Sequence, residues 1–207
     1  MYSEAAKTAM ILSQDEQKRG NYKVARDLLF QMHRQLISNN LHVSSSMLDA
    51  LILLHSYLIV KPLIKRNDQK AAARMLIRVA NNISLFSTHM VDILTSTVIV
   101  CTKVGLNASA FKYAVQLLRP ELRRSISDKY RKKIESIVRK AKDAKDEEEP
   151  KTPCPFCNEA IFETTLICQF CKNRLPCCII TGKHIIVEDF ALCSNCDFPG
   201  YFSEFKK

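Results

Sequence analysis

Eight potential metal ligands occur in the last third of the chain, and they form four pairs. Three of the pairs have two residues between their cysteines, a spacing that lets two thiolates bind one ion from a single tight turn. Two such turns complete a tetrahedral site, so eight ligands predict two structural Zn²⁺ ions. A segment this short buries little apolar surface and needs a metal or disulfides to fold. The predicted ligands are Cys154 and Cys157, Cys168 and Cys171, Cys178 and His184, and Cys193 and Cys196.

The nine cysteines of the chain could instead form disulfides in an exported protein. The first residues, Met-Tyr-Ser-Glu-Ala-Ala-Lys, contain no basic segment followed by an apolar one, so we expect no secretion signal. The close pairing of the cysteines and the expected reducing compartment both favour metal over disulfides.

The first two pairs form the pattern C-x2-C-x10-C-x2-C, which is typical of a zinc ribbon. Ten residues between the pairs are enough for a short hairpin, and residues 161–167 are strand-like. Phe156 and Phe170 each precede the second cysteine of their pair. This half of the cysteine-rich segment therefore predicts a self-sufficient site.

The ligands of the second half are less determined by the sequence. Cys177 and Cys178 are adjacent, so we expect their side chains to diverge and only one of them to face a metal. Cys178 is the preferred ligand, because it lies in an expected apolar Cys-Ile-Ile strand before a turn. His184 is the predicted fourth ligand, with a partly exposed turn histidine as the alternative. Sequential pairing of the four steps and a cross-brace, as in RING modules, are both open, and the self-sufficient first half favours sequential pairing.

Sites closed by four protein ligands leave no position for water or substrate, which argues against hydrolytic and deaminase chemistry. The sequence shows no nucleophile–base constellation, Gly-rich phosphate loop or pair of catalytic carboxylates. We therefore predict no catalytic residues, no cofactor besides zinc and no enzymatic activity. The remaining histidines are single residues on expected helices, where packing or solvent-facing roles are favoured, and Cys101 is expected to be a buried apolar residue. These histidines are His33, His42, His55 and His89.

The rest of the chain predicts helices, because apolar residues recur at helical spacing and Gly and Pro are scarce before residue 150. An acidic run and two prolines at 146–153 end the last helix and indicate a linker. We predict a helical-repeat domain at 1–145, this linker at 146–153 and a double zinc-binding module at 154–207. The expected helices lie at about 3–18, 22–38, 45–65, 68–82, 88–104, 107–118 and 126–145.

A weak repeat runs through these helices. A turn residue at Gly20, Asn67 and Gly105 is followed by a small residue five positions later, and then by apolar residues. Stacked helical hairpins require this order, so the predicted fold is mainly α, a degenerate tetratricopeptide-like antiparallel hairpin solenoid. The first helix has no preceding cap segment, from which we expect the C-terminal piece of a longer protein; a complete small helical protein is the alternative.

The net charge of +10 lies in the helical part, because residues 1–150 hold 25 Lys and Arg against 15 Asp and Glu. The basic helix at 119–145 also carries carboxylates and few aromatic residues, so a solvated face is favoured and no nucleic acid is expected. The apolar segment 51–60 is too short and too interrupted for a membrane span. The aromatic tail at 198–205 is expected to pack on the metal site and to leave a remainder for docking.

The whole chain resembles the C-terminal end of a family of larger proteins, and one motif is the most specific part of the resemblance. The motif Leu175-Pro176-x-Cys178-Ile179-x-Thr181-Gly182-Lys183-His184, with Cys193-x2-Cys196-Asp197-Phe198-Pro199, is similar to that of certain intraflagellar transport complex A subunits. Those subunits carry beta-propellers, a tetratricopeptide-type solenoid and a C-terminal zinc module. No propeller sequence occurs in this chain, so propeller roles are not carried over.

The resemblance implies a non-enzymatic scaffold or adaptor that supports assembly of complex A, retrograde ciliary transport and ciliary entry of membrane-protein cargo. The implied partners are other complex A subunits and membrane-protein cargo or its adaptors, in the cytoplasm and at the axoneme and basal body of the cilium. The alternative function is a RING-type E3 ubiquitin ligase module, which requires a cross-braced pair of zinc sites.

Overall fold

The computed structural model describes residues 2–140 and 145–206. The chain divides into two compact units, Met1–Glu147 and Glu148–Lys207, which we call the helical unit and the cysteine-rich unit. The division falls inside the predicted linker at 146–153, and it assigns the first acidic residues of that linker to the helical unit.

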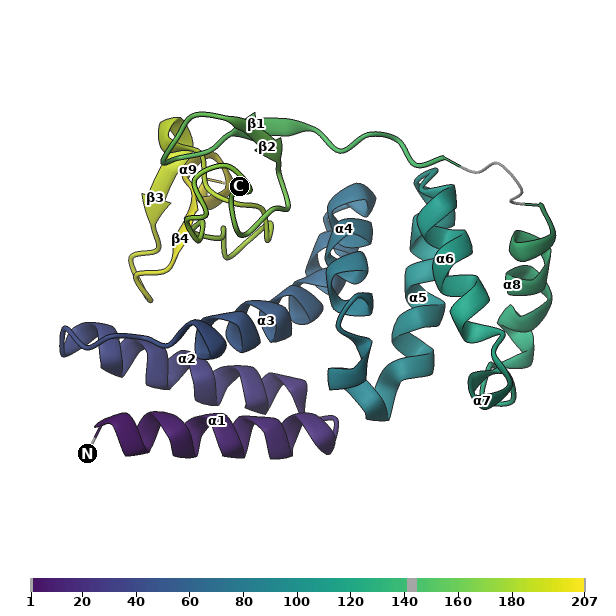
Figure 1. Ribbon diagram of the computed structural model, residues 1–207, viewed down its shortest axis with the longest axis horizontal. Helices are drawn as coiled ribbons and strands as arrows, with labels where there is room; N and C mark the ends of the chain where they lie inside the picture. The colour runs from purple at the N-terminus through teal and green to yellow at the C-terminus, as the bar shows by residue number, and fades with distance from the viewer. Residues whose placement is uncertain (1, 141–144, 207) are drawn as a thin grey trace. The chain divides into compact units, whose positions relative to one another are not determined.

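In the helical unit the helices α1 to α6 each pack on the next α-helix in sequence, and α8 packs on α6 (Figure 1). Four of the predicted ranges agree with the structure to within one residue. The predicted helix at 88–104 is preceded by a 3-10 segment, η1, and the short helix α7 was not predicted. The bounds are α1 Tyr2–Lys18, α2 Tyr22–Ser38, α3 Ser45–Lys65, α4 Gln69–Ala80, η1 Ile83–His89, α5 Met90–Lys103, α6 Asn107–Leu117, α7 Pro120–Arg123 and α8 Asp128–Lys140. The predicted extension of α8 through 141–144 lies outside the described residues.

The repeated turn residues share one backbone conformation. Gly20, Asn67 and Gly105 have positive φ values of 84°, 63° and 80°. In each turn the backbone N–H of the following residue donates to the carbonyl oxygen five residues before it. This is the Schellman arrangement, which provides a hydrogen bond for a free carbonyl at the end of the helix. The small residue of each repeat, Ala25, Ala72 or Ala110, is at most 1% exposed, so adjacent helices approach closely there.

Tyr22 links the first repeat to the middle of the helical unit. Its ring centroid lies 5.1 Å from those of Tyr57 and Phe86, in edge and tilted arrangements that aromatic pairs prefer. Phe86 comes from η1 and is fully buried. Gln17 of α1 also donates to the carbonyl oxygen of Leu85 at 2.7 Å. The 3-10 segment η1 therefore packs against both α1 and α5, and its Phe86 contacts Tyr22 of α2 and Tyr57 of α3.

Asp146 caps a helix from a distant part of the chain. Helix α6 has no side-chain cap of its own at Leu106. The carboxylate of Asp146 accepts from the backbone N–H groups of Ala108 and Ser109, at 2.8 and 3.1 Å, and from the Ser109 hydroxyl at 2.5 Å. Glu147 adds an ion pair of 2.7 Å to Lys70. The first residues of the predicted linker are therefore anchored on the helical unit.

Two helical stretches, Ser45–Lys65 and Ile83–Lys103, are long and apolar enough to cross a membrane by length and composition alone. The sequence predicted no span, because polar residues interrupt its apolar segment. Helices in a protein core meet the same criterion, and α3 and α5 supply many of the buried residues of the helical unit. The apolar character of the two stretches is weak evidence for a membrane segment.

The cysteine-rich unit contains two short antiparallel hairpins. Strand β1, Lys151–Pro153, pairs with β2, Ala160–Phe162, and β3, Phe190–Leu192, pairs with β4, Pro199–Tyr201. A 3-10 turn, η2 (Val187–Asp189), precedes β3, and a short helix, α9 (Phe202–Phe205), follows β4. The predicted strand-like stretch at 161–167 forms a strand only in its first two residues. Strand β1 lies in the predicted linker, so the folded unit begins before the first cysteine.

The aromatic tail packs within the second hairpin. A Cβ atom on Gly200 would lie 2.5 Å from Cζ of Phe205, so the ring occupies the space that the glycine leaves. Tyr201 is buried, and its hydroxyl donates to the carbonyl oxygen of His184. The ring of Phe202 remains 52% exposed, with the Lys206 ammonium 3.9 Å from its centroid. The tail thus has a packed part and an exposed part.

Candidate metal centre and helical groove

The first two cysteine pairs lie in turns of the same geometry, which we call knuckles. In the first knuckle, Cys154–Glu159, the N–H of Cys154 donates to Glu159 and the N–H of Asn158 donates to Cys154, both at 2.9 Å. The second knuckle, Cys168–Asn173, repeats both bonds at 3.0 Å. Asn158 and Lys172 occupy the left-handed region at the same place, with φ of 63° and 61°. These bonds turn both thiols of a knuckle to one side.

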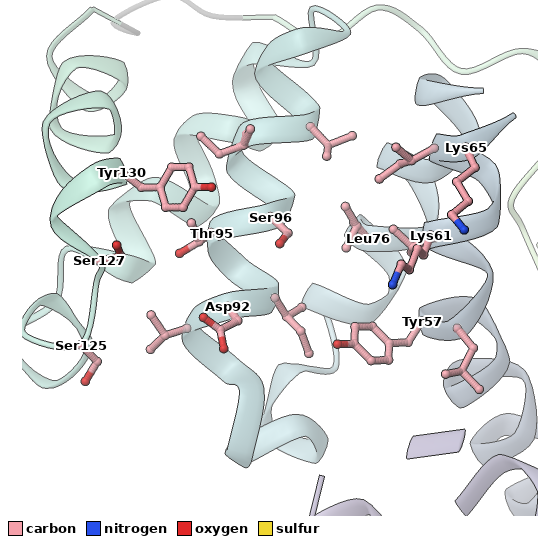
Figure 2. Close-up of a pocket in the computed structure, with 17 residues that line it drawn as sticks. Tyr57, Lys61, Lys65, Leu76, Asp92, Thr95, Ser96, Ser125, Ser127 and Tyr130 are labelled. Carbon is pink, nitrogen blue, oxygen red and sulfur yellow. The ribbon is translucent and has the colours of Figure 1, made fainter. Parts of the chain in front are cut away.

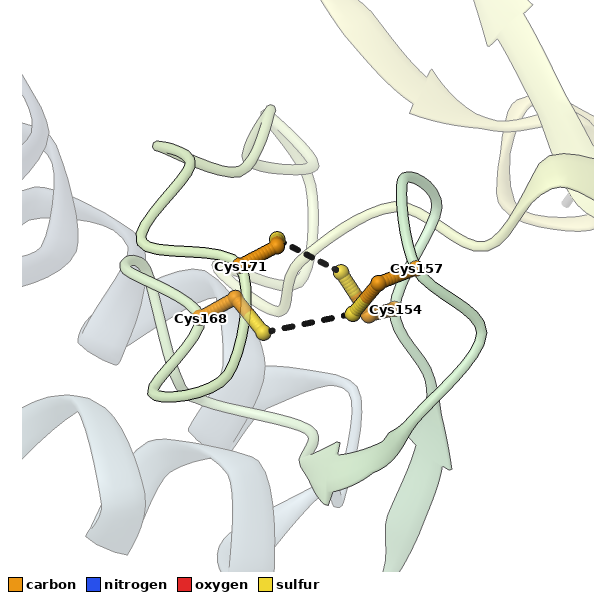
Figure 3. Close-up of side chains that lie close together, drawn as sticks. All are labelled: Cys154, Cys157, Cys168 and Cys171. Carbon is orange, nitrogen blue, oxygen red and sulfur yellow. Dashed lines mark hydrogen bonds between the residues drawn. The ribbon is translucent and has the colours of Figure 1, made fainter.

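The two knuckles bring four sulfurs together (Figure 3). Every sulfur of the cluster lies within 4.8 Å of the other three. Sγ of Cys154 is 3.9 Å from that of Cys171, and Sγ of Cys157 is 3.7 Å from that of Cys168. This pairing of the first knuckle with the second confirms the sequential arrangement for this half of the unit. A RING cross-brace would combine the first ligand pair with the third pair, Cys178 and His184.

The sulfur cluster suits a dication. The backbone N–H groups of Cys171 and Phe170 point at Cys168 and lower its pKa to about 7. At Cys157 the N–H of Glu159 lowers the pKa, but burial and the three neighbouring thiols together raise it to about 12. Four thiolates so close to one another require a positive charge between them. Four cysteine ligands with no open position fit a structural Zn²⁺ site, and this set could hold such an ion.

The second predicted set does not form such a group. Among the described residues, Cys178, His184, Cys193 and Cys196 are not within 4.8 Å of one another as a set of three or more. Cys193 and Cys196 share a C-x2-C turn, and Cys178 is fully buried. The predicted Cys-Ile-Ile strand is wrong. Residues 179–181 form a turn that begins at Cys178, and the N–H of Gly182 donates to the carbonyl oxygen of Cys178 at 2.9 Å. The neighbouring Cys177 pairs with His184 in an isolated β-bridge.

His184 is fully buried, and its ring lies against the first hairpin. Nε2 is 2.9 Å from the hydroxyl oxygen of Thr152. Burial lowers the pKa of the ring, and the nearby carbonyls of Pro153 and Glu163 oppose that shift. The backbone N–H of His184 donates to the Glu163 carbonyl at 2.9 Å. His184 thus joins the two halves of the cysteine-rich unit, which excludes the exposed turn histidine that was its alternative.

Cys101 and His89 pack within the helical unit, whereas His42 is exposed. Cys101 is fully buried, and desolvation raises its pKa to about 12, as expected of an apolar residue. Burial also lowers the pKa of His33. The ring of His89 contacts that of Tyr22 at a centroid distance of 5.3 Å.

The helical unit contains a groove that the sequence did not indicate (Figure 2). Its volume is about 850 Å³, within the range of small-ligand pockets. Helices α3, α4 and α5 supply apolar residues such as Ile64, Leu76 and Ile93, and Tyr130 of α8 faces them. Lys61 and Lys65 of α3 stand along one side. The spacing of apolar residues along a helix predicts which face is apolar. Whether a neighbouring helix covers that face depends on the packing angle between the helices, which the spacing does not predict.

The chain has relatives of known identity. It is 50% identical over 205 residues to WD repeat-containing protein 19 of mouse and of human, and 48% identical over 204 residues to WD repeat-containing protein dyf-2 of Caenorhabditis elegans. The matches cover 99% of this chain but 15% of each relative. No protein-family model matches the chain. The resemblance inferred from the motifs is confirmed: the chain is a homologue of WD repeat-containing protein 19 and corresponds to its C-terminal part.

Proposed function

We propose that this chain is a non-enzymatic scaffold or adaptor region of intraflagellar transport complex A. The observation that carries the proposal is its identity of about half with WD repeat-containing protein 19 over nearly all of its residues. Its roles are to support assembly of the complex, retrograde ciliary transport and ciliary entry of membrane-protein cargo. Its partners are other complex A subunits and the cargo or its adaptors, in the cytoplasm and at the axoneme and basal body.

The metal has a structural role in this proposal. Cys154, Cys157, Cys168 and Cys171 hold one Zn²⁺, which fixes two knuckles that have little apolar core between them. Since the four sulfurs fill the tetrahedron, no position remains for a substrate. The ion therefore has a structural role and stabilises the fold of the unit.

The groove of the helical unit is the surface that we assign to a partner subunit. It combines an apolar floor with the two lysines of α3, whose side chains have no ion pair among the described residues. An apolar surface flanked by a few charged groups is typical of a specific interface. A carboxylate of the partner beside Lys61 or Lys65 would give both orientation and selectivity.

The test of this assignment is co-purification from ciliated cells that express full-length protein with a Lys61→Glu and Lys65→Glu double substitution. We expect the recovery of at least one complex A subunit, measured by quantitative mass spectrometry, to fall by about tenfold or more. Lys132→Glu with Lys133→Glu is the matched control, because it reverses two exposed charges on α8 outside the groove. Equal recovery of every subunit with both double variants would contradict the assignment.

The RING-type ligase remains the alternative function. The sequential sulfur cluster speaks against it, since a ligase module of that type requires a cross-brace. An autoubiquitination assay on the purified chain is expected to give no ubiquitin conjugates above a no-enzyme control.

A further inference from the structure

The cysteine-rich unit contains four knuckles of one backbone geometry, and they differ only in their side chains. The third, Cys178–Lys183, has its two bonds at 2.7 and 2.9 Å, and the fourth, Cys193–Phe198, has them at 2.9 and 2.8 Å. The residue in the left-handed region is Gly182 in the third and Asp197 in the fourth, with φ of 72° and 57°. The third knuckle was not visible in the sequence because it lacks a C-x2-C pair.

Alignment of the knuckles shows which ligand the third one lacks. The second sulfur of the other three knuckles comes from Cys157, Cys171 and Cys196, three residues after the first. The same position in the third knuckle holds Thr181, which is 6% exposed. Its hydroxyl oxygen lies 3.4 Å from the backbone nitrogen of Lys183. A neutral hydroxyl is a poor substitute for a thiolate toward Zn²⁺, since structural zinc sites use Cys and His.

From this geometry we infer that the cysteine-rich unit holds a single structural Zn²⁺, in the first two knuckles, and that the third is a zinc knuckle without its metal. The inference rests on the zinc proposed for the Cys154 cluster. Cys178, Cys193 and Cys196 supply three thiols, one fewer than a closed cysteine site requires. Thr181 stands where the fourth would be.

His184 does not supply the missing ligand in this arrangement. Its ring lies against the carbonyls of Pro153 and Phe162, and Nε2 bonds to Thr152. These contacts belong to the first hairpin and not to the fourth knuckle. Nδ1 is buried and has no hydrogen-bond partner among the described residues, so the zinc content of a His184→Gln chain is the direct check on this nitrogen.

Apolar packing holds the third knuckle in place of an ion. Cys178, Ile185 and Tyr201 form a buried cluster, against which Ile180 and Ile186 pack. The N–H of Ile179 also donates to the carbonyl oxygen of Pro199 at 3.0 Å, which ties the third knuckle to the strand after the fourth. The third and fourth knuckles are therefore neighbours. With Thr181 in place of a cysteine the two knuckles supply three thiols, and among the described residues these three do not gather within 4.8 Å of one another.

The test is the number of zinc ions per chain, measured by inductively coupled plasma mass spectrometry on the purified full chain after dialysis. We expect one ion in the unaltered chain, one in Cys196→Ser and one in His184→Gln. Thr181→Cys is expected to raise the count to two, and adding Cys196→Ser to it should return the count to one. The double variant shows whether the added ion is held by the third and fourth knuckles together, because thiols of an unfolded chain can also bind zinc.

Two ions in the unaltered chain, with one lost in Cys196→Ser or His184→Gln, would overturn the inference. So would a count that stays at one in Thr181→Cys, because position 181 would then not be the vacant ligand position. Cys157→Ser tests the underlying proposal separately: it should remove the single ion, and retention of zinc there would refute the site in the first two knuckles whatever the other variants show.

Discussion

At Cys168 the knuckle turn changes the acidity of a thiol through backbone geometry. The N–H groups of Cys171 and Phe170 point at the sulfur and lower its pKa from 9.0 to about 7. A thiolate is the form that binds zinc, so this turn prepares the ligand before the ion arrives. Cys157 has the opposite balance, with a pKa of about 12, and becomes a thiolate only when the ion displaces its proton.

These two pKa values predict a zinc affinity that depends on pH. The pKa of Cys168 is lowered. Its thiolate therefore contributes fully to zinc binding above the ordinary thiol pKa of 9.0, and this contribution is lost as pH falls through about 7. Zinc occupancy should therefore fall steeply between about pH 8 and about pH 5, because protons compete for all four sulfurs. Competition with a chromophoric zinc chelator, titrated at a series of pH values, measures this zinc occupancy. The chain with Cys177→Ser, outside the cluster, should give the same profile, and a flat occupancy over this range would contradict the assignment of these ligands.

Among the elements, helix α6 depends on a residue that is not part of it. Its N-cap residue, Leu106, makes no side-chain hydrogen bond to the first backbone N–H groups of the helix. The carboxylate of Asp146 accepts from two of these groups instead. A negative charge at this place also interacts favourably with the positive end of the helix dipole. The anchored residue fixes where the chain leaves the helical unit.

Asp146→Ala should therefore lower the free energy of unfolding of the helical unit by about 1 kcal/mol, the usual cost of losing an N-cap. Thermal unfolding of the full chain, followed by far-ultraviolet circular dichroism, measures the change. Glu148→Ala is the control, because the pair of Glu148 with Lys151 is exposed on both sides. Equal stability of the two variants would show that the Asp146 contacts do not stabilise α6.

On the scale of the whole molecule, the two units draw their stability from different sources. The helical unit has a continuous core of buried aliphatic and aromatic side chains, whereas the buried cluster of the first two knuckles consists of Cys154, Ile161, Cys168 and Leu175. So small a core cannot offset the entropy of ordering the chain without a metal.

A strong zinc chelator should consequently unfold the cysteine-rich unit and leave the helices intact. Far-ultraviolet circular dichroism is expected to keep nearly all of its helical signal, while amide resonances of residues 148–206 collapse toward unfolded positions in NMR spectra. Readdition of zinc should restore them. Well-dispersed resonances for this segment in excess chelator would contradict a structural role for the metal.

Much of this architecture follows from local sequence. The helix ends at Gly20, Asn67 and Gly105 were predictable because a positive φ and a Schellman turn need only the residues that form them. The C-x2-C spacing likewise determined the first two knuckles, since each closes on itself through two backbone bonds. The third knuckle was missed because its backbone pattern persists without the second cysteine.

The sequence by itself determined the order of the helices, the turns between them and the four sulfurs of one metal site, since short-range backbone bonds and side-chain periodicity act within a few residues. Only the tertiary structure decided that Asp146 caps α6, that His184 belongs to the first hairpin and that α3 and α5 leave a groove open. Each of these depends on the packing of segments distant in sequence, and burial and shape set that packing without leaving a spacing rule along the chain.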